Sequence, residues 1–403
     1  MKKFDLLTPE GTRDLLFEEC VALRMVEEKL RNIFESHGYS EVVTPGLEFF
    51  DVFNNKSRFF LQEDMYKLTD AKGRLMVLRP DSTMPIARLV GTRLRDRRLP
   101  LKLFYNQSIY RANPKDSGRD DEFSQSGIEI IGGDVMRSDM EALSIAAEVM
   151  ESFETEDYRF EIGDSAFFAM LCAKLPLSEV EMDSLREYVQ TKNYPALKTL
   201  LSAYSGNKYA EALCRLPELF GGAEVFDEAE KIMPDENTRF VLDKLKNVYS
   251  NLCELGIKDK VTVDLGLISK TEDYYTGIVF KGYVEGYGMP VLSGGRYDKL
   301  IADFGVDTPA TGFAVNVNAV TDAILRSSGG NLAPVPDVLI FSEEDSIAES
   351  VRHCRKLISE GLKAEYADFK TIEEAQEYAA YRRIKRLDVV THDGITENYK
   401  EGN

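Results

Sequence analysis

Apolar residues recur at helical spacing near the start of the chain. Between residues 16 and 37 they fall on one face, as an amphipathic helix requires. These positions are Leu16, Val21, Leu23, Val26, Leu30, Ile33 and Phe34. His37 and Gly38 follow, and glycine is typical just after a helix because it adopts left-handed backbone angles without a Cβ clash. The pattern therefore predicts a long helix that ends at Gly38.

Short apolar runs bounded by turn residues follow this helix. They lie at residues 74–80, 101–111, 126–133, 159–164, 261–267, 277–283 and 312–317. Few of them are separated by a crossover helix, so we expect one large and mostly antiparallel sheet. Helices at 139–153 and 319–326 would cover one face of that sheet.

Two further segments differ from this pattern. Residues 166–258 are rich in Leu, Ala, Glu and Lys, with amphipathic stretches at 177–192 and 237–255, which indicates a helical insertion. Residues 327–336 are rich in Gly, Asn and Pro and read as a linker. Beyond it, residues 337–403 show a βαβαβ pattern. We expect an α+β fold with a core domain at 1–326 and a small C-terminal α/β domain at 337–403.

Composition narrows the class of protein. With 43% hydrophobic and 30% charged residues, the chain reads as an ordinary globular protein. It lacks an apolar run of ~18 residues that could cross a bilayer, and no apolar signal segment precedes Pro9. We expect a cytoplasmic protein that contacts no membrane. The net charge of −19 argues against nucleic-acid binding, because phosphate recognition depends on basic surfaces.

Cysteine and histidine, the usual metal ligands, do not form a motif in this sequence. The five cysteines are scattered and lack CxxC spacing, so we expect them to be small buried side chains. The histidines, His37, His353 and His392, lie far apart in the chain. The sequence therefore predicts no metal site and no Ser-His-Asp catalytic triad.

Six strings carry a family resemblance. They are GYSEVVTPGLE (38–48), LRPDSTMPIAR (78–88), FYNQSIYRANPKDSGRDDEFSQSGIEIIG (104–132), DYYTGIVF (273–280), SGGRYDKLIADFG (293–305) and PATGFAV (309–315). In order and spacing they resemble the class II histidyl-tRNA synthetases and their paralogues, the regulatory subunits of ATP phosphoribosyltransferase. The resemblance runs from Pro9 to about Leu325, and the C-terminal domain resembles a shortened anticodon-binding domain. It implies a six- or seven-stranded antiparallel core, with Pro45 in the dimer-forming segment.

The resemblance also implies a pocket for free histidine. The matching positions are Asp81, Thr83, Arg111, Gln125, Glu129, Lys270, Tyr274 and Tyr275. In the family, Asp81, Thr83 and Gln125 match residues that hold the α-amino group. Glu129 and the tyrosine pair match residues that bind and enclose the imidazole ring, and the two basic residues face the carboxylate. Each residue alone would read as an ordinary strand or surface residue; their joint occurrence in ordered motifs favours the pocket.

Two of these positions depart from the synthetase pattern. Asp81 stands where the enzymes usually have glutamate, which is one methylene longer. Lys270 stands where they have arginine, and lysine keeps the charge but loses the planar bidentate fork. Lysine can still hold a carboxylate, but it is less suited to orienting that group for adenylation.

The nucleotide-binding residues of the synthetases are missing. Asn113, Asp121 and Ala319 replace a glutamate and two arginines that hold ATP in the family. Each charge-assisted hydrogen bond contributes on the order of 1.5–3 kcal/mol. Their loss should cost roughly 5 kcal/mol, or about a few thousandfold in ATP affinity. We expect neither adenylation nor a bound cofactor, and therefore no catalytic residues.

The resemblance then implies a non-catalytic regulatory subunit of ATP phosphoribosyltransferase. Its partner would be the short-form catalytic subunit, in a hetero-octamer, and L-histidine would act as the feedback ligand. Two alternatives remain open at this point. One is an active histidyl-tRNA synthetase, which would need the missing motif 3 arginine. The other is a synthetase-like module for RNA binding or kinase sensing, for which the basic run at 93–102 is the one candidate feature.

Overall fold

The chain divides into two compact units. The computed structural model describes residues 6–54, 61–113, 120–153, 155, 157–268, 274–327 and 334–399. Unit 1 spans residues 1–330 and unit 2 spans residues 331–403, so the division falls inside the expected linker. Within the described ranges, every helix is too short or too polar to cross a bilayer.

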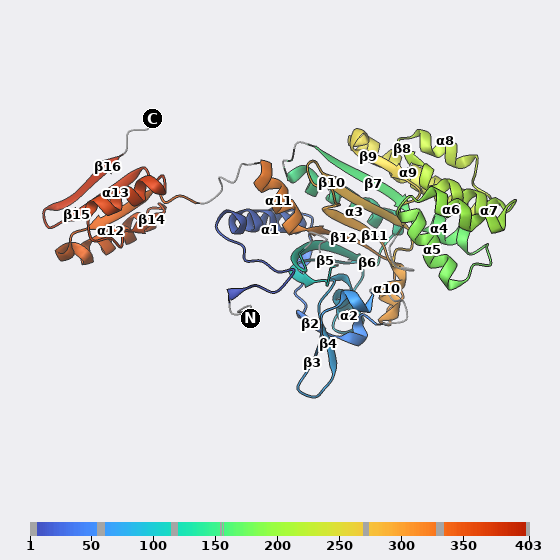
Figure 1. Cartoon of the computed structure of the whole chain (residues 1–403), viewed down its shortest axis with the longest axis horizontal. Helices are drawn as coiled ribbons and strands as arrows, with labels where there is room; N and C mark the ends of the chain where they lie inside the picture. Colours follow the sequence, from blue (N-terminus) through green and yellow to red (C-terminus); the bar gives the residue numbers. More distant parts are fainter. Residues whose placement is uncertain are drawn as a thin grey trace. The chain divides into compact units, whose positions relative to one another are not determined.

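Unit 1 is built on a nine-stranded sheet (Figure 1). In spatial order the strands are β1 (Ser40–Glu41), β5 (Leu101–Tyr110), β6 (Glu122–Ile131), β12 (Ala310–Asn316), β11 (Leu292–Arg296), β10 (Ile278–Val284), β7 (Tyr158–Asp164), β9 (Val261–Asp264) and β8 (Phe220–Gly221). The six strands from β5 to β7 pair antiparallel, which confirms the expected core. Three short outer strands extend it: β1 pairs parallel with β5, β9 pairs parallel with β7, and β8 pairs antiparallel with β9.

The run at 74–80 was expected in this sheet, and that expectation is wrong. Its strand, β4 (Leu75–Leu78), pairs with β2 (Leu47–Phe49) and β3 (Lys67–Thr69) in a separate three-stranded sheet. The Asp70 carboxylate accepts hydrogen bonds from the backbone N–H groups of Lys72 and Arg74, which closes a local β3–β4 turn. Alternating apolar residues identify a strand but not its partner.

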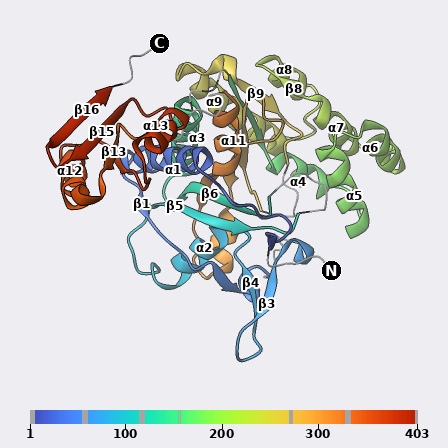
Figure 2. The ribbon, with the colours of Figure 1, turned by 60° about the vertical axis from the view of Figure 1, so that its left-hand side comes forward.

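Helices cover one face of the large sheet (Figures 1 and 2). They are α1 (Glu18–Ser36), α3 (Val135–Ser152), α9 (Glu236–Glu254) and α11 (Val317–Ser327). Their apolar sides, including Leu30 and Phe34 of α1, pack on Ile128 and Phe313 in one core cluster. The first helix stops as expected, because Gly38 has φ +79°.

The opposite face of the sheet carries two shorter helices. They are α2 (Thr83–Thr92) and α10 (Asp298–Asp303), and they pack against each other. A second apolar cluster, which includes Met84, Tyr105 and Tyr297, lies between these helices and the sheet. The predicted pocket residues of β6 and α2 lie at this face.

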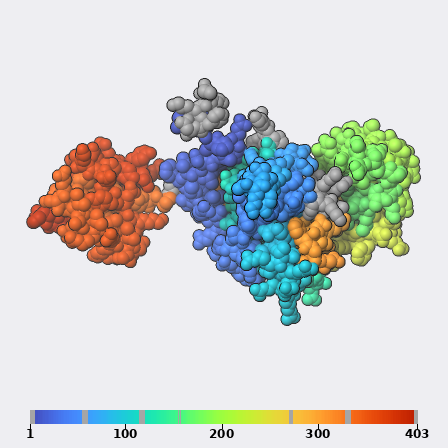
Figure 3. Space-filling model, turned by 90° about the horizontal axis from the view of Figure 1, so that it is seen from below, coloured from blue at the N-terminus to red at the C-terminus, as the bar shows by residue number. Residues whose placement is uncertain are grey.

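A helical insertion follows β7, as expected. It contains α4 (Ala166–Cys172), α5 (Glu179–Gln190), α6 (Tyr194–Leu201), α7 (Lys208–Arg215), α8 (Glu224–Glu230) and α9. It forms a green and yellow lobe beside the N-terminal part of the unit (Figure 3). The expectation that this segment holds no strand is wrong in one detail, because β8 pairs with β9 at the sheet edge. Short 3-10 turns occur at Phe50–Val52, Gln62–Asp64, Ser202–Tyr204, Leu216–Glu218, Lys258–Lys260 and, in unit 2, Glu344–Ser346.

Unit 2 is a small α/β domain with its own core. Its strands, in the order β14 (Ala364–Tyr366), β13 (Val338–Ser342), β15 (Arg386–Thr391) and β16 (Gly394–Tyr399), form one sheet. Helices α12 (Ile347–Ser359) and α13 (Ile372–Tyr381) pack on different core clusters of that sheet. The three parallel strands were expected, whereas antiparallel β16 was missed. Its signal was the turn at His392 and Asp393, which joins two strands as a hairpin.

A buried ion pair fixes the end of β11. The Arg296 Nη2 lies 2.7 Å from Asp139 of α3 and also donates to the Ser138 hydroxyl at 2.9 Å, while Nη1 donates to Asp298 at 2.9 Å. Arg296 is 2% exposed and Asp139 is 1% exposed. This network sets the position of the next residue, Tyr297, which points toward the opposite side of the strand.

Candidate functional site

Strand β6 presents two predicted pocket positions, Gln125 and Glu129, with Gly127 between them on the same face. Gln125, Gly127 and Glu129 alternate with Ser124 and Ser126, so the two sets lie on opposite faces of the sheet. Gln125 and Glu129 are both buried. The strand itself therefore places an amide and a carboxylate on the face that α2 and α10 cover.

The Glu129 carboxylate is enclosed by hydroxyl donors. The Thr83 hydroxyl donates to Oε1 at 2.7 Å, and the Tyr297 hydroxyl donates to Oε2. A Cβ on Gly312 of β12 would lie 2.3 Å from Oε2, so only glycine leaves room for this carboxylate. Burial raises the pKa of Glu129 to about 8; the two hydroxyl donors lower it, and the nearby Asp81 charge raises it further.

Asp81 contacts the first turn of α2 with one carboxylate oxygen and faces Arg111 with the other. Its Oδ1 accepts the backbone N–H groups of Thr83 at 2.8 Å and Met84 at 3.2 Å, which holds the first turn of α2. Its Oδ2 lies 3.7 Å from the Arg111 guanidinium. Burial raises the pKa of Asp81, although Arg111 and the two backbone donors oppose this shift.

Arg111 supplies the cation of the pocket in the part of the chain that the structure describes. Its Nε donates to the Pro80 carbonyl at 2.8 Å, and its guanidinium lies 5.8 Å from the centre of the Phe123 ring. The second predicted cation, Lys270, lies outside the described residues. Arg111 therefore lies near both Asp81 and Phe123, which is at the start of β6.

Tyrosine rings form a wall of the pocket. Tyr274 and Tyr275 lie perpendicular to each other with centroids 4.8 Å apart, and Tyr274 lies 6.1 Å from Tyr297. A Cβ on Gly295 of β11 would lie 2.7 Å from Tyr275 Cδ1, so this ring rests directly on the strand backbone. Burial raises the pKa of the Tyr275 hydroxyl, and the charges of Asp81 and Glu129 raise it further, so both acids act on this ring.

Gln125 carries an unsatisfied acceptor. Its Oε1 is buried and makes no hydrogen bond with any described residue. Buried polar atoms are almost always paired, so an unpaired carbonyl oxygen on the pocket face suits a ligand that donates a hydrogen bond. A positively charged ammonium group would fit that oxygen best.

Sequence reasoning missed two residues of this site. Tyr297 donates to Glu129, and a Cβ on Gly127 would lie 2.7 Å from the Tyr105 hydroxyl, so Tyr105 also lies over this strand. Tyr297 stands inside the SGGRYDKL string and directly after the buried Arg296, which was the available signal. Tyr105 had none beyond its place on a strand.

Comparison with known proteins identifies the family. A family model described as histidyl-tRNA synthetase matches residues 11–320. A protein of Clostridium acetobutylicum named ATP phosphoribosyltransferase regulatory subunit is 38% identical, with 94% of each chain covered. One of the same name from Clostridium botulinum is 36% identical over 97% of this chain and 92% of its own. The chain belongs to this family of histidyl-tRNA synthetase-like regulatory subunits.

A solved structure agrees with this assignment. It is titled an ATP phosphoribosyltransferase regulatory subunit/histidyl-tRNA synthetase from Bacillus halodurans C, and it matches with a TM-score of 0.83 and 28% identity. The match covers 97% of this chain and 99% of that one. The match to this solved structure therefore includes residues of both units.

The nucleotide side of the site is occupied by internal contacts. The Asp121 carboxylate, 8% exposed, accepts hydrogen bonds from the Tyr66 hydroxyl and from the Asn113 backbone N–H, the latter at 3.0 Å. The Asn113 side chain donates to the Asp120 carbonyl at 2.9 Å. Ala319 is 1% exposed and packs in the core under the sheet. The Asp121 carboxylate and the Asn113 side-chain NH₂ are therefore used in internal contacts, and Ala319 has no polar group to offer a nucleotide.

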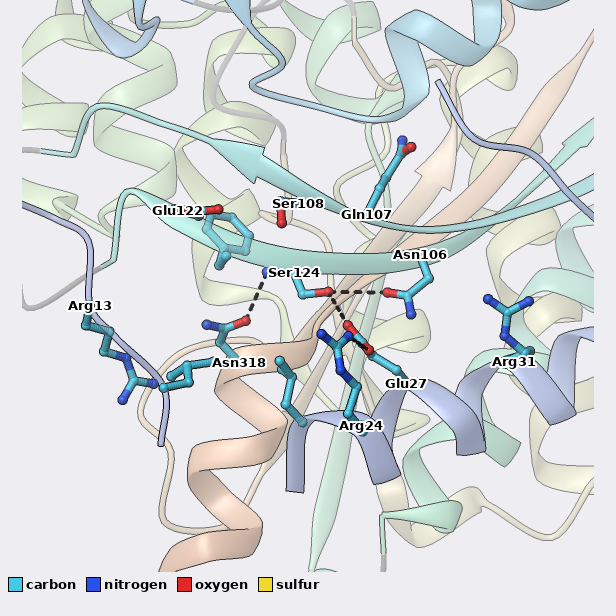
Figure 4. Close-up of a pocket in the computed structure, with 13 residues that line it drawn as sticks. Arg13, Arg24, Glu27, Arg31, Asn106, Gln107, Ser108, Glu122, Ser124 and Asn318 are labelled. Carbon is cyan, nitrogen blue, oxygen red and sulfur yellow. Dashed lines mark hydrogen bonds and ion pairs between the residues drawn. The ribbon is translucent and has the colours of Figure 1, made fainter. Parts of the chain in front are cut away.

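A separate cavity of about 520 Å³ lies between α1, α11 and the β5–β6 pair (Figure 4). It includes none of the predicted pocket residues. The Ser124 hydroxyl bonds to Glu27 and Asn106, and the Ser124 backbone N–H donates to the Asn318 side chain at 2.9 Å. Its arginines, Arg13, Arg24 and Arg31, are each paired with carboxylates. The arginines of the cavity are therefore already neutralised by neighbouring carboxylates.

The raised pKa of Glu129 predicts a pH-dependent stability. Between the unfolded pKa near 4.5 and the folded pKa of about 8, the folded state keeps a proton that the unfolded state has lost. Burial of Glu129 therefore lowers the free energy of unfolding of unit 1 as the pH rises through this window. The Glu129→Gln variant has no titrating group at this position, so it lacks this loss of stability. The free energy of unfolding of the wild type should fall relative to the variant between pH 5 and pH 8.5, by on the order of a few kcal/mol.

Urea unfolding of unit 1 in the full chain, at several pH values, measures this difference. Glu161→Gln is a matched control, since Glu161 lies on β7 outside the pocket and is partly exposed. Parallel pH profiles for the wild type and Glu129→Gln would contradict a protonated Glu129.

Proposed function

We propose that this chain is a non-catalytic regulatory subunit of ATP phosphoribosyltransferase, and that its pocket binds L-histidine as the feedback signal. One observation carries the proposal: the amino-acid half of the synthetase-like site is equipped for a ligand, whereas the nucleotide half is spent on internal hydrogen bonds. A chain built in this way can recognise an amino acid but lacks the groups to activate it.

The chemistry of the pocket fits histidine group by group. The unpaired Oε1 of Gln125 and the Oδ2 of Asp81, which lies 3.7 Å from Arg111, suit the α-ammonium group. The Glu129 carboxylate, beside the tyrosine wall, suits an imidazole N–H, because a bound donor repays part of the cost of burying this acid. Arg111 suits the carboxylate, with Lys270 as the second cation expected from the sequence. Two buried acids and one arginine favour a ligand with more cationic than anionic character.

The partner follows from the family. The curated relatives are named regulatory subunits of ATP phosphoribosyltransferase. We infer that this chain assembles with the short-form catalytic subunit, which condenses ATP with phosphoribosyl pyrophosphate in the first step of histidine biosynthesis, as a hetero-octamer. Histidine can shift the assembly toward a less active state only by its difference in affinity between the two states.

Self-association through the class II dimer segment is part of this proposal. Apolar side chains are exposed around Pro45: Val43 is 76%, Leu47 46% and Phe49 42% exposed. A second copy of the chain would bury them, since clustered exposed apolar residues mark interaction surfaces.

The pocket assignment predicts the loss of feedback. In the assembled enzyme, Glu129→Ala removes the acceptor for the imidazole and Tyr275→Ala removes one wall, so each should abolish inhibition by histidine. Activity without histidine and co-purification of the two subunits should persist. The measurement is the phosphoribosyltransferase rate against histidine concentration, with Glu161→Ala as a control that keeps normal inhibition. Full inhibition of either pocket variant would mean that histidine binds elsewhere.

The missing nucleotide half predicts that one reversion is insufficient. Ala319→Arg restores the motif 3 residue of the synthetases, but Asn113 and Asp121 remain, and the new guanidinium would start from a buried position in the core. The variant should show no histidine-dependent exchange of pyrophosphate into ATP, and a lower melting temperature. Measurable exchange would instead support the alternative, a histidyl-tRNA synthetase that has lost one residue.

A further inference from the structure

An N-terminal strap, residues 9–13, lies against the end of the β5–β6 hairpin where residues 111–121 connect the two strands. The Gly11 carbonyl accepts the backbone N–H of Asp121 at 2.6 Å. Gly11 has φ +76°, and a Cβ there would lie 2.4 Å from Asp121 Cγ. Any other residue would therefore have to move the strap away from Asp121.

The strap is also held by charge. Arg13 reaches Asp120 at 3.1 Å, Glu19 of α1 at 2.7 Å and Asp322 of α11 at 3.1 Å. Phe17, between the strap and α1, has φ 41°, an unfavourable value for a residue with a Cβ. A strained bend persists only where its surroundings hold it, so the strap position is specified by the contacts at both ends.

Asp121 joins this strap to the pocket. Its backbone carbonyl accepts the N–H of Arg111 at 2.8 Å, while its carboxylate accepts from Tyr66 and from the Asn113 N–H. Arg111 is held a second time by the bond from its Nε to the Pro80 carbonyl. The backbone of Arg111 is thus held by the Asp121 carbonyl, and its guanidinium is held by the Pro80 carbonyl.

We propose that Asp121, locked by the strap, is the positioning residue for Arg111, so that the guanidinium is pre-organised for the carboxylate of the bound ligand. The inference rests on the proposed histidine site. Asp121 touches no ligand itself; it acts by removing the motion of Arg111 that binding would otherwise have to freeze. An acid at this position therefore has a role beyond repelling nucleotide.

The test separates the ligand's carboxylate from the rest of the ligand. L-histidine and histamine share the imidazole and the amine, but histamine has no carboxylate. In Asp121→Asn one carboxylate oxygen is replaced by an NH₂ that cannot accept, so either the Tyr66 hydroxyl or the Asn113 N–H loses its acceptor and the anchor loosens. Calorimetric titration of the full chain should show histidine affinity reduced roughly tenfold, the size of one charge-assisted contact, and histamine affinity unchanged within about twofold.

Two further variants make the result specific. Gly11→Ala keeps aspartate at position 121 but displaces the strap, because its Cβ would clash with the Asp121 side chain, and it should lower the histidine-to-histamine affinity ratio in the same way. Asp120→Asn makes the same chemical change one residue away, where it removes an exposed pair of Arg13 that has two other partners, and should leave the ratio at its wild-type value. If Asp121→Asn does not fold, Tyr66→Phe removes one donor to the same carboxylate and should also lower the ratio.

The outcomes distinguish this inference from the proposed function. An unchanged ratio in Asp121→Asn and Gly11→Ala, or an equal loss of both ligands, would overturn the positioning role and leave the histidine site standing. Failure of the wild-type chain to bind either ligand, alone and in the assembled enzyme, would overturn the histidine site and this inference together.

Discussion

Burial of two carboxylates beside one guanidinium is the constraint around which the site is organised. Asp81 and Glu129 are 6% and 2% exposed, and burying such groups is costly unless they are hydrogen-bonded and paired. Every neighbouring element reduces this cost: the first turn of α2 donates two N–H groups to Asp81, while Thr83 and Tyr297 donate hydroxyls to Glu129. These donors leave an acidic pocket in which the Gln125 amide oxygen is unpaired. Such a pocket favours a ligand that brings positive charge.

The sheet holds this pocket in place through its own buried charges. Arg296 faces α3 and pairs with Asp139, while the next residue, Tyr297, reaches the pocket on the opposite side of the strand. The same logic explains the nucleotide side, where Asp121 is tied to the strap and to Arg111 rather than left to solvent. A site of this kind keeps the recognition half of a synthetase and uses the activation half as support.

Much of this architecture is readable from the sequence because it depends on local patterns. The antiparallel core strands, the helix that ends at Gly38 and the helical insertion all follow from periodicity and turn residues, and Thr83 and Glu129 come together as the ordered motifs imply. Long-range partners are not written in such patterns. The pairing of β4 outside the main sheet, the Tyr297 hydroxyl on Glu129 and the internal hydrogen bonds of Asp121 each join residues far apart in the chain. Lys270 lies outside the described residues, so its place in the site stays a prediction.

The central claim is that the chain recognises histidine and has lost the means to use ATP. Separate calorimetric titrations of L-histidine and of magnesium-ATP into the purified chain, repeated on the assembled enzyme, test it most directly. The account predicts saturable binding of histidine at one site per chain and no heat of binding for ATP to the isolated chain. Tight ATP binding by the isolated chain, or no histidine binding to the chain in either form, would contradict it.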